Sequence, residues 1–560
     1  MIIWIKPYLP DWLQGYRCAW LASDLLAGLT LAAYAIPVAI AYSSMAGLPA
    51  QSGLYGYLFG GLGYAFFGTS RQLAIGPTAA ISLAVGTSLA KFAPHDPERI
   101  ATLAALTALV TAVMGGLGWL LRLSQLVNFV SETVLLGFKA GAALSIAVTQ
   151  LPKLFGLPAG GHDFFSRVYS LCEHLGDTNP YVLAFGLVAV LLLMAGEKCL
   201  PGRPLALLVV IASLLVMSLS SLDVRGIKVV GLLPQGLPAL ALPEVTREEI
   251  SEIVPLALAC LLLSYVESIS AARTFAANHQ YRIDPRRELL ALGAANLLGG
   301  LAQAYPLAGG LSQSAVNDKA GAKTPMAILW ASGMIGLVLL FMTALFQSLP
   351  EAVLAAIVLV AIKGLIDIRG LAHAWRVSRF DFNVAMGALI GVLFLGILKG
   401  VLLASIFSIL LLLRRGSYPH VAFLGRIPGS DQFSDLARHP HNETIPGVVI
   451  FRAEAPLLYF NVEHIQEKVL ERLAQEGESV KLVIADLSSS PNLDLAGAHM
   501  LATLQTQLAS EDRLLRLVNA HANARDLLRA EGLEAKIGSI RREATLADLI
   551  EGFEEGNAAS

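Results

Sequence analysis

Two short apolar segments of this chain each follow a break rich in glycine and proline, and they hold the first residues that could do chemistry. Gly76-Pro77 precedes a run shorter than a membrane span, and Gly309-Gly310 precedes Leu311 to Ala320, which turns polar near its end. Proline cannot donate a backbone hydrogen bond, so such a break inside a bilayer is tolerated where the helix start faces protein or a water-filled cavity. The pattern predicts two half-length helices of the kind that form transporter binding sites.

The starts of these half-helices are suited to an anion. Free backbone N–H groups and the positive end of the helix dipole favour negative charge there, and small side chains let a ligand approach the backbone. Capping of each helix by Thr78 and Ser312 alone is an alternative that the sequence does not separate from binding. Tyr42, in the first long apolar run, is added to the candidate anion site. The other candidates are Thr78, Ala79, Ala80, Leu311, Ser312 and Gln313.

Glu267 is a carboxylate deep in an apolar run, Leu256 to Ile269. An ionised group there costs roughly 3 kcal/mol on insertion scales, so such a residue usually faces a cavity and has a function. It could exchange a proton, coordinate Na⁺ or pair with a basic group, and Arg273 is the candidate for a purely structural pair. Lys139, at the inner end of another run, is interpreted as interfacial or structural.

The composition identifies the elements that must position these residues. The 560 residues are 55% hydrophobic and 15% charged, with a mean hydropathy of +0.63, which excludes an ordinary soluble protein. A bilayer span takes roughly 20 apolar residues. Two sets of seven runs are predicted, and the third run of each set is the short, broken one, which indicates an inverted repeat; unrelated kinks are the alternative. The predicted spans are 22–45, 53–68, 77–90, 100–121, 130–150, 181–198 and 205–221, then 252–275, 287–304, 312–321, 325–348, 351–367, 380–398 and 400–414.

The domain organisation follows from where the apolar runs stop. Residues 1–20 form a predicted cytoplasmic segment, and 21–418 a transmembrane domain with repeats at 21–222 and 251–418. Residues 440–560 carry 19 Asp and Glu against 11 Lys and Arg, a net charge of −8, and form a predicted soluble α/β domain. This acidic surface argues against binding of nucleic acid. The distribution of Lys and Arg places both termini in the cytoplasm, with a cell (inner) membrane as the predicted location.

Alternating apolar patterns in the tail predict its elements. The predicted strands are 448–451, 457–460, 481–487 and 514–519, and helices are predicted to begin at Val462, Leu495 and Ala522.

Several motifs resemble those of the SulP anion permeases, the solute carrier 26 relatives. In the first half they are Asp24-x3-Gly28-Leu29-Thr30, Ala46-Gly47-Leu48-Pro49, Gly53-Leu54-Tyr55, Phe67-Gly68-Thr69-Ser70-Arg71 and Ile75-Gly76-Pro77. In the second half they are Glu267 with Ala272, Phe275 and Ala276, Ser312 to Asn317, and Ala320 to Thr324. With a STAS-like tail, the resemblance covers nearly the whole chain.

The resemblance implies an α-helical polytopic fold of fourteen spans, in which a core domain (spans 1–4 and 8–11) moves as an elevator against a gate domain (spans 5–7 and 12–14). It also implies dimers, and anion binding between half-helices three and ten, which follow short strands at Gln72 to Ile75 and Ala304 to Leu307. Family substrates include sulfate, bicarbonate, chloride and dicarboxylates.

This chain departs from the family pattern at three positions. Val38 stands where many relatives have Gln, and Gln313 where many have Arg. These changes are expected to alter anion preference or to make a coupled cation more necessary. In the tail, Leu495 stands where phosphorylated relatives carry a hydroxyl residue, so regulation by phosphorylation there is not expected.

The leading hypothesis is secondary active transport of an inorganic oxyanion, of the sulfate or bicarbonate class, coupled to H⁺ or Na⁺ at Glu267. Alternatives are a C4-dicarboxylate transporter, an uncoupled anion exchanger or channel, and an anion sensor that signals through the tail. No nucleophile and base, metal cluster or nucleotide loop is recognisable, so neither an enzyme nor a cofactor beyond the coupled cation is expected. Expected partners are a small anion, membrane lipid, a second copy of the chain and a cytoplasmic protein that binds the tail.

Overall fold

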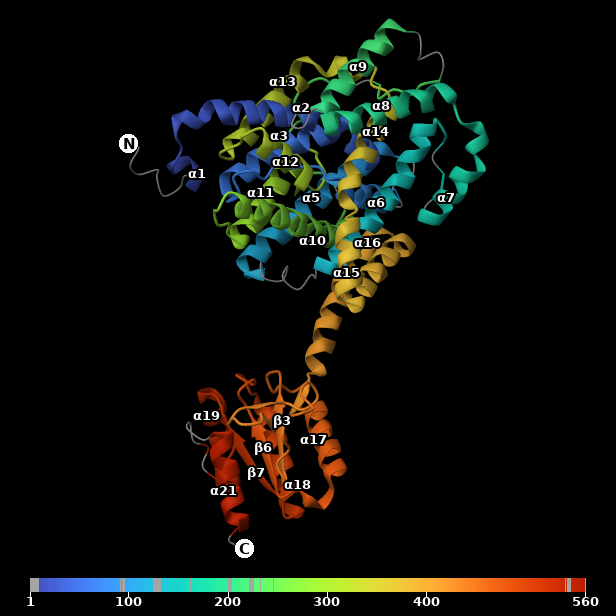
Figure 1. Cartoon of the computed structure of the whole chain (residues 1–560). Coiled ribbons are helices and arrows are strands. Elements are labelled where there is room, and N and C mark those ends of the chain that lie inside the picture. The colour runs from blue at the N-terminus through green and yellow to red at the C-terminus, as the bar shows by residue number, and fades with distance from the viewer. Residues whose placement is uncertain are drawn as a thin grey trace, which may run out of the picture. The chain divides into compact units, whose positions relative to one another are not determined.

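The computed structural model describes residues 10–558 except 91, 93–95, 124–131, 159, 162, 200–203, 221–225, 232, 245, 539 and 541–544. Two compact units make up the chain, Met1–Ser408 and Ile409–Ser560 (Figure 1). Within the predicted N-terminal segment, residues 1–9 lie outside the described residues. The remainder forms the short helix α1 (Asp11–Gln14) and a single turn, Cys18–Trp20.

Each predicted span overlaps a described helix. Among the described residues, six helices are long and apolar enough to cross a membrane, and three shorter apolar helices accompany them. The prediction of a helical membrane fold is thereby confirmed in outline. The helices that overlap the predicted spans are α2 (Leu21–Met45), α3 (Ala50–Phe67), α4 (Ala79–Leu89), α5 (Pro97–Leu120), α6 (Glu132–Phe155), α8 (Pro180–Cys199), α9 (Leu205–Leu219), α10 (Arg247–Asn278), α11 (Pro285–Leu301), α12 (Leu311–Lys319), α13 (Met326–Phe341), α14 (Glu351–Ile362) and α16 (Arg379–Ser417).

The last two predicted spans lie in one continuous element, α16, with a break at Gly396. This residue has φ 80° and ψ 169°, a backbone conformation that favours glycine. A side chain at Gly400 would collide with the backbone of Val392, so the chain folds back on itself around the break. Two further helices connect the spans, α7 (Phe164–Glu173) and α15 (Ile368–Val377).

Two short strands bring the half-helices together. Strand β1 (Ile75–Gly76) precedes α4 and strand β2 (Ala308–Gly309) precedes α12, and they pair antiparallel, with Ile75 opposite Gly309. The predicted strand positions, Gln72 to Ile75 and Ala304 to Leu307, are therefore displaced. Backbone groups there bond to side chains instead of to another strand. These bonds run from Leu307 N–H to Asn296 Oδ1 (2.9 Å), and from Asn317 Nδ2 to the Gln72 carbonyl (3.0 Å).

Two buried carboxylates hold the loops next to the half-helices. Glu288 on α11 accepts hydrogen bonds from Tyr64 Oη (2.8 Å) and from the backbone N–H groups of Thr69 (2.7 Å) and Ser70 (3.0 Å), all ahead of β1. Asp24 on α2 accepts from the N–H (3.1 Å) and hydroxyl (2.7 Å) of Thr324, just after α12. Each carboxylate thus satisfies loop groups from the opposite half of the unit, which stabilises the arrangement of the two repeats.

Packing divides the first unit into two groups of helices, which correspond to the predicted core and gate. In the core group, α11 packs against α3 and α5, α13 against α2 and α3, and α10 against α4, α5 and α12. In the gate group, α14 packs against α6, α8 and α9. The two groups meet where α2 contacts α9 and α14 and where α4 contacts α6.

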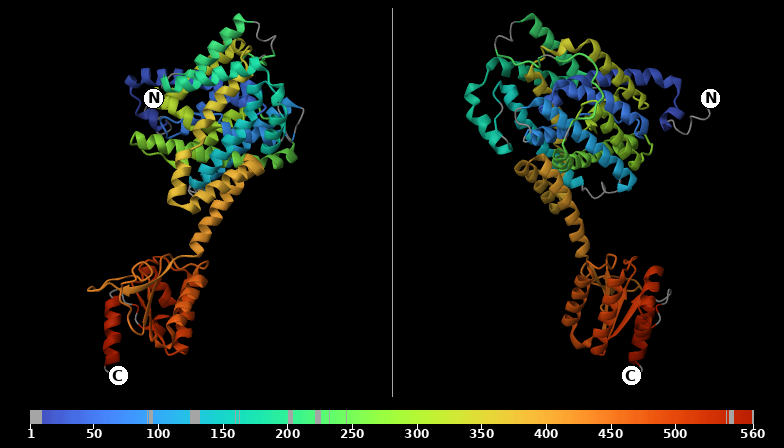
Figure 2. Two further views of the ribbon diagram at one scale, coloured as in Figure 1. Left: turned by 45° about the vertical axis from the view of Figure 1, so that its right-hand side comes forward. Right: turned by 180° about the vertical axis from the view of Figure 1, so that it is seen from behind.

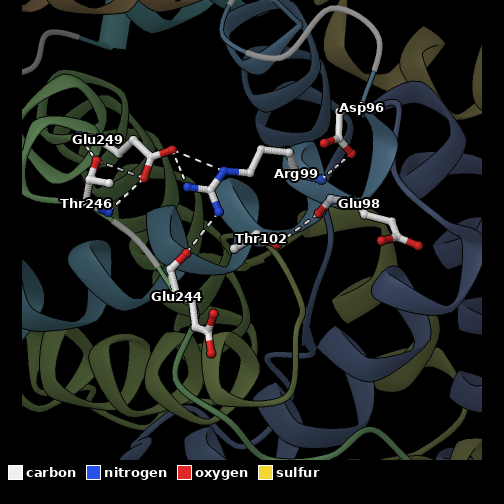
Figure 3. Close-up of polar contacts among 7 residues, drawn as sticks. All are labelled: Asp96, Glu98, Arg99, Thr102, Glu244, Thr246 and Glu249. Atoms are coloured by element: carbon white, nitrogen blue, oxygen red, sulfur yellow. Dashed lines mark hydrogen bonds and ion pairs between the residues drawn. The ribbon is translucent and has the colours of Figure 1, made fainter.

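A charged contact fastens the start of α10 to the start of α5 (Figure 3). Arg99 donates from Nε (3.1 Å) and Nη2 to Glu249 Oε1, and from Nη1 to the Glu244 carbonyl (2.9 Å). The other Glu249 oxygen accepts from the N–H of Thr246 (2.8 Å), whose side chain in turn caps α10. The contact anchors the segment that connects the two repeats.

The second unit contains a five-stranded sheet in the order β4-β3-β5-β6-β7. Strand β3 is antiparallel to β4 and β5, whereas β5, β6 and β7 are parallel. Helices α17 (Val462–Glu476) and α18 (Leu495–Ser510) cover one face and α21 (Leu546–Ala558) the other (Figure 2). The strands are β3 (Val421–Arg426), β4 (Phe433–Asp435), β5 (Val448–Ala453), β6 (Leu482–Asp486) and β7 (Leu514–Val518).

Most of the predicted tail elements are present, including helix α19 (Ala522–Ala530), but two details differ. Strands β3 and β4 precede residue 440, so the sheet extends beyond the predicted start of this domain. The predicted strand 457–460 is wrong, because the segment forms a turn in which the Leu458 N–H donates to Asn461 Oδ1 (3.0 Å). Only an isolated bridge joins Leu457 to Leu493.

Replacing Arg99 is expected to destabilise the first unit. Arg99→Gln should lower the free energy of unfolding, because Glu249 keeps its charge but loses two hydrogen bonds. Thermal unfolding of the full chain in detergent measures this as a lower Tm. Glu98→Gln is the matched control, because the Glu98 contact drawn in Figure 3 involves the backbone carbonyl, which accepts from Thr102 Oγ1 at 2.9 Å, and the substitution leaves that carbonyl in place. An equal Tm loss in both variants would contradict the proposed anchor.

Candidate functional site

A cavity of about 100 Å³ lies where the half-helices α4 and α12 begin. Its walls come from α2, α6, α10 and the turn Lys363–Leu365 as well as from the two half-helices. All of the candidate residues from the sequence line it, namely Tyr42, Thr78, Ala79, Ala80, Glu267, Leu311, Ser312 and Gln313. Residues from both repeats, far apart in the chain, are therefore brought to one place.

The half-helix starts have no side-chain caps. Thr78 is the N-cap residue of α4 and Gly310 that of α12, and neither supplies a capping hydrogen bond. The structure therefore does not support the alternative in which Thr78 and Ser312 only cap their helices. Because the first amides of a helix have no carbonyl partner within it, those of Ala79, Ala80 and Leu311 are available at the cavity.

Thr78 and Glu267 are directly linked. The Thr78 hydroxyl donates to Glu267 Oε2 at 3.1 Å, from one core helix to another. The Glu267 carboxylate lines the cavity with Thr78 beside it. Arg273, the candidate for a structural pair with Glu267, lies further along the same helix, α10, and does not line the cavity.

Gln313 has a different position from the one expected of a ligand contact. Its Nε2 donates to the carbonyls of Ala74 (2.9 Å) and Ala308 (3.2 Å), and its Oε1 accepts from the Tyr57 hydroxyl. All polar atoms of this side chain are thus engaged, and the residue is only 3% exposed. The side chain joins the segments ahead of both half-helices, which leaves only the Gln313 backbone to contribute to an anion site.

Two cavity residues were missed or misjudged from the sequence. Lys139 on α6 lines the same cavity, although its sequence position indicated an interfacial or structural residue. Leu135, Phe138, Lys139 and Ala142 all line the wall at helical spacing, and this periodicity is the signal that could have placed Lys139 on the cavity face. Tyr34, about two helical turns before Tyr42 on α2, also lines it.

A larger hollow of about 540 Å³, here called the vestibule, adjoins the cavity and shares Tyr34, Ser312, Ala361 and Gly364 with it. The exposed side chains of Lys319 and Lys363 line it, so it reaches the protein surface. Val38, which replaces the Gln of many relatives, faces the vestibule and does not line the cavity.

Comparison with known proteins identifies the family to which this chain is similar. The sulfate permease family matches residues 21–388, and the STAS domain matches residues 439–548. The chain belongs to the sulfate permease family. The resemblance inferred from the sequence motifs is thereby confirmed, as is the combination of a helical membrane domain with a STAS domain.

Relatives of this permease are similar over nearly their full length. A probable sulfate transporter of Mycobacterium tuberculosis is 33% identical over 96% of this chain and 96% of its own. High affinity sulfate transporter 1 of Stylosanthes hamata is 31% identical over 99% of this chain and 87% of its own. These relatives are transporters, which agrees with the expectation that the permease is not an enzyme.

Solved structures show the same fold. Murine Solute Carrier 26 family member A9, an anion transporter in the inward-facing state, is 26% identical, has a TM-score of 0.86 and matches over 96% of this chain and 92% of its own. The transmembrane domain of a cyanobacterial bicarbonate transporter has a TM-score of 0.60 at 22% identity, over 70% of this chain and 98% of its own. The permease is accordingly a multi-pass membrane protein.

Removing the Thr78 hydroxyl is expected to weaken binding of a transported anion. Thr78→Val should raise the half-saturation constant for labelled sulfate in proteoliposomes roughly tenfold. This is the change in affinity expected when one hydrogen bond to a charged group is lost. Thr107→Val is the control, because the Thr107 hydroxyl is buried, donates to the Leu103 carbonyl and lies outside the cavity. A half-saturation constant that does not change in Thr78→Val would exclude this hydroxyl from the anion site.

Proposed function

We propose that this permease is a secondary active transporter of a small inorganic oxyanion of the sulfate or bicarbonate class. The observation that carries the proposal is the cavity at which two uncapped half-helix starts from opposite repeats meet. The transport of sulfate by relatives and of bicarbonate by a structural neighbour supports the substrate class.

The chemistry of holding the anion follows from the groups around the cavity. Backbone N–H groups of α4 and α12 and the dipoles of both helices attract negative charge. The hydroxyls of Ser312 and Tyr42 have no partner among the described residues and supply further donors. Lys139 adds a full positive charge at the wall contributed by α6.

Glu267 gives a physical route for cation coupling. An ionised Glu267 repels the anion and also accepts the only hydroxyl proton of Thr78. A protonated Glu267 carries no charge and donates to Thr78, which frees the Thr78 proton for the anion. Na⁺ bound to Glu267 would likewise remove the repulsion. Binding of the cation and of the anion therefore favour each other, which is the requirement for symport.

Movement of the core group against the gate group would carry the site across the membrane. The half-helices belong to the core group, whereas Phe138, Lys139 and Leu365 face them from the gate group. The vestibule opens the site to one side of the protein. The likeness to an inward-facing relative supports a cytoplasmic vestibule, and with it an elevator mechanism.

The remaining predictions are part of the same proposal. The permease resides in the inner membrane of the cell, and both of its termini lie in the cytoplasm. It acts as a homodimer. The STAS domain binds a cytoplasmic protein. At the turn where α18 begins, Leu495 is 51% exposed and Asp494 caps the helix, accepting from the Gly497 N–H at 2.9 Å. A partner at this turn would meet an apolar side chain and no phosphate acceptor.

An uncoupled anion exchanger is the second candidate, and Lys139 is the observation that favours it. A fixed positive charge at the cavity can balance Glu267, so that an anion binds without a coupled cation. Proteoliposomes loaded with the unlabelled anion and offered the same anion in labelled form (sulfate, bicarbonate or succinate), each with an imposed proton or sodium gradient, separate the candidates. Accumulation driven by one gradient supports symport, whereas exchange indifferent to both gradients supports the exchanger. No flux of any anion would overturn both.

Neutralising Glu267 is expected to separate coupling from binding. Glu267→Gln resembles the protonated carboxyl, so gradient-driven sulfate accumulation should fall at least about tenfold while sulfate-for-sulfate exchange continues. Glu98→Gln, on an exposed helix start, controls for loss of a carboxylate elsewhere. A Glu267→Gln protein whose uptake still follows the imposed gradient would remove Glu267 from the coupling step.

A further inference from the structure

A second cavity, of about 240 Å³, lies at the opposite end of α4 from the candidate site. Polar groups from three elements reach it. Thr87 and Ser88 come from the last turn of α4, Ser145 from α6, and Arg167 from α7. Its last wall is the break in α16, with Gly396 and Lys399. We refer to it below as the outer cavity.

The charge of the outer cavity is positive and incompletely balanced. Arg167 and Lys399 face a single carboxylate, Asp163, which is engaged in capping α7 through the Ser166 N–H (2.9 Å). Within the described residues, Lys399 has neither an ion pair nor a hydrogen bond. Burial lowers the pKa of Arg167, although Asp163 opposes the shift. A second negative charge would therefore be stabilised here.

An unused hydroxyl points to a ligand independently of these charges. Ser88 is only 8% exposed, lines the outer cavity and has no hydrogen-bond partner among the described residues. By contrast, the neighbouring Thr87 hydroxyl donates back to the Leu83 carbonyl at 2.8 Å. Because buried hydroxyls are normally satisfied, Ser88 has the position of a donor to a molecule in the cavity.

The break in α16 gives the outer cavity its shape. Gly396, at φ 80°, interrupts the helix, so Lys399 stands at the start of a new helical segment. Phe165 on α7 packs on Phe394, just before the break, with 4.6 Å between ring centroids. The basic residues are thus held by two elements that contact each other.

The outer cavity is separated from the candidate site by about one helical turn. On α4, Ala80 lines the candidate site and Leu83 the outer cavity, and on α6 the corresponding residues are Ala142 and Ser145. Three residues correspond to about 4.5 Å along a helix axis. The far end of α12, at Lys319, instead lines the vestibule. The vestibule and the outer cavity therefore lie on opposite sides of the candidate site.

We propose that the outer cavity binds a small oxyanion, so that it acts as a receiving site on the side of the membrane opposite the vestibule. This inference rests on the proposed transport function, because the anion held by Arg167, Lys399 and Ser88 is the one that next occupies the candidate site. Relative movement of α4 and α6 would open the apolar contact between the two sites. The fold then sets the order in which the anion occupies the two sites, first the outer cavity and then the candidate site.

Sided transport kinetics test the proposal with labelled sulfate as the probe. Arg167→Gln and Lys399→Gln should each raise the half-saturation constant roughly tenfold when sulfate is offered on the side of the outer cavity, and leave it unchanged from the vestibule side. Intact cells and inside-out vesicles present the two sides separately. Arg247→Gln is the control, because Arg247 is exposed and lines neither cavity. Equal changes from both sides, or none, would overturn the proposal.

A second measurement does not require transport. In a full chain in which Cys18, Cys172 and Cys199 are replaced by Ser, Ser145→Cys places a thiol in the outer cavity. A negatively charged methanethiosulfonate should label it faster than a positively charged one, Arg167→Gln should reduce this preference, and sulfate should slow the labelling. Labelling without charge preference and without sulfate protection would overturn the outer site even in a chain that transports sulfate. Sulfate protection in a chain without flux would retain the site and reject the transport function.

Discussion

The arrangement of this permease depends on how the backbone amides at two helix starts are satisfied inside a membrane protein. Unpaired N–H groups in hydrocarbon cost several kcal/mol each, so a helix that begins at this depth must face protein or a polar cavity. Helices α4 and α12 both begin there without side-chain caps. The cavity between them supplies the missing polar environment, and an anion satisfies the amides more favourably than water because it also matches the helix dipoles.

Polar side chains of the core group fall into two classes that serve different purposes. Gln313, Glu288 and Asp24 use their polar atoms on loops and strands of the opposite repeat, and this holds the two helix starts in one place. Ser312, Tyr42 and Ser88 line cavities, and their hydroxyls have no partner in the part of the chain that the structure describes. The first class gives rigidity to the core group, and the second leaves donors for a ligand that moves.

Charge is arranged along a path through the core and gate groups. Lys319 and Lys363 line the vestibule, Lys139 and Glu267 the candidate site, and Arg167 and Lys399 the outer cavity. Each of the three cavities also has one carboxylate in its lining: Glu197 in the vestibule, Glu267 in the candidate site and Asp163 in the outer cavity. None of the three cavities therefore has a large excess of charge. Weak net attraction at successive sites suits a transported ion, because an anion must both enter and leave each of them.

Local sequence determined the elements and the half-helix starts, because apolar runs report membrane burial and a glycine or proline break reports where a helix cannot continue. It also identified Thr78 and Ser312 as candidates for the anion site and Glu267 as the candidate for cation coupling. Tertiary structure alone decided what those residues touch. Gln313 bonds to a carbonyl 239 positions away, and this occupies a side chain that looked available for an anion. The displaced strands β1 and β2, the turn at 457–460 and the cavity position of Lys139 were decided in the same way, since hydrogen bonds and packing between distant segments override the local pattern.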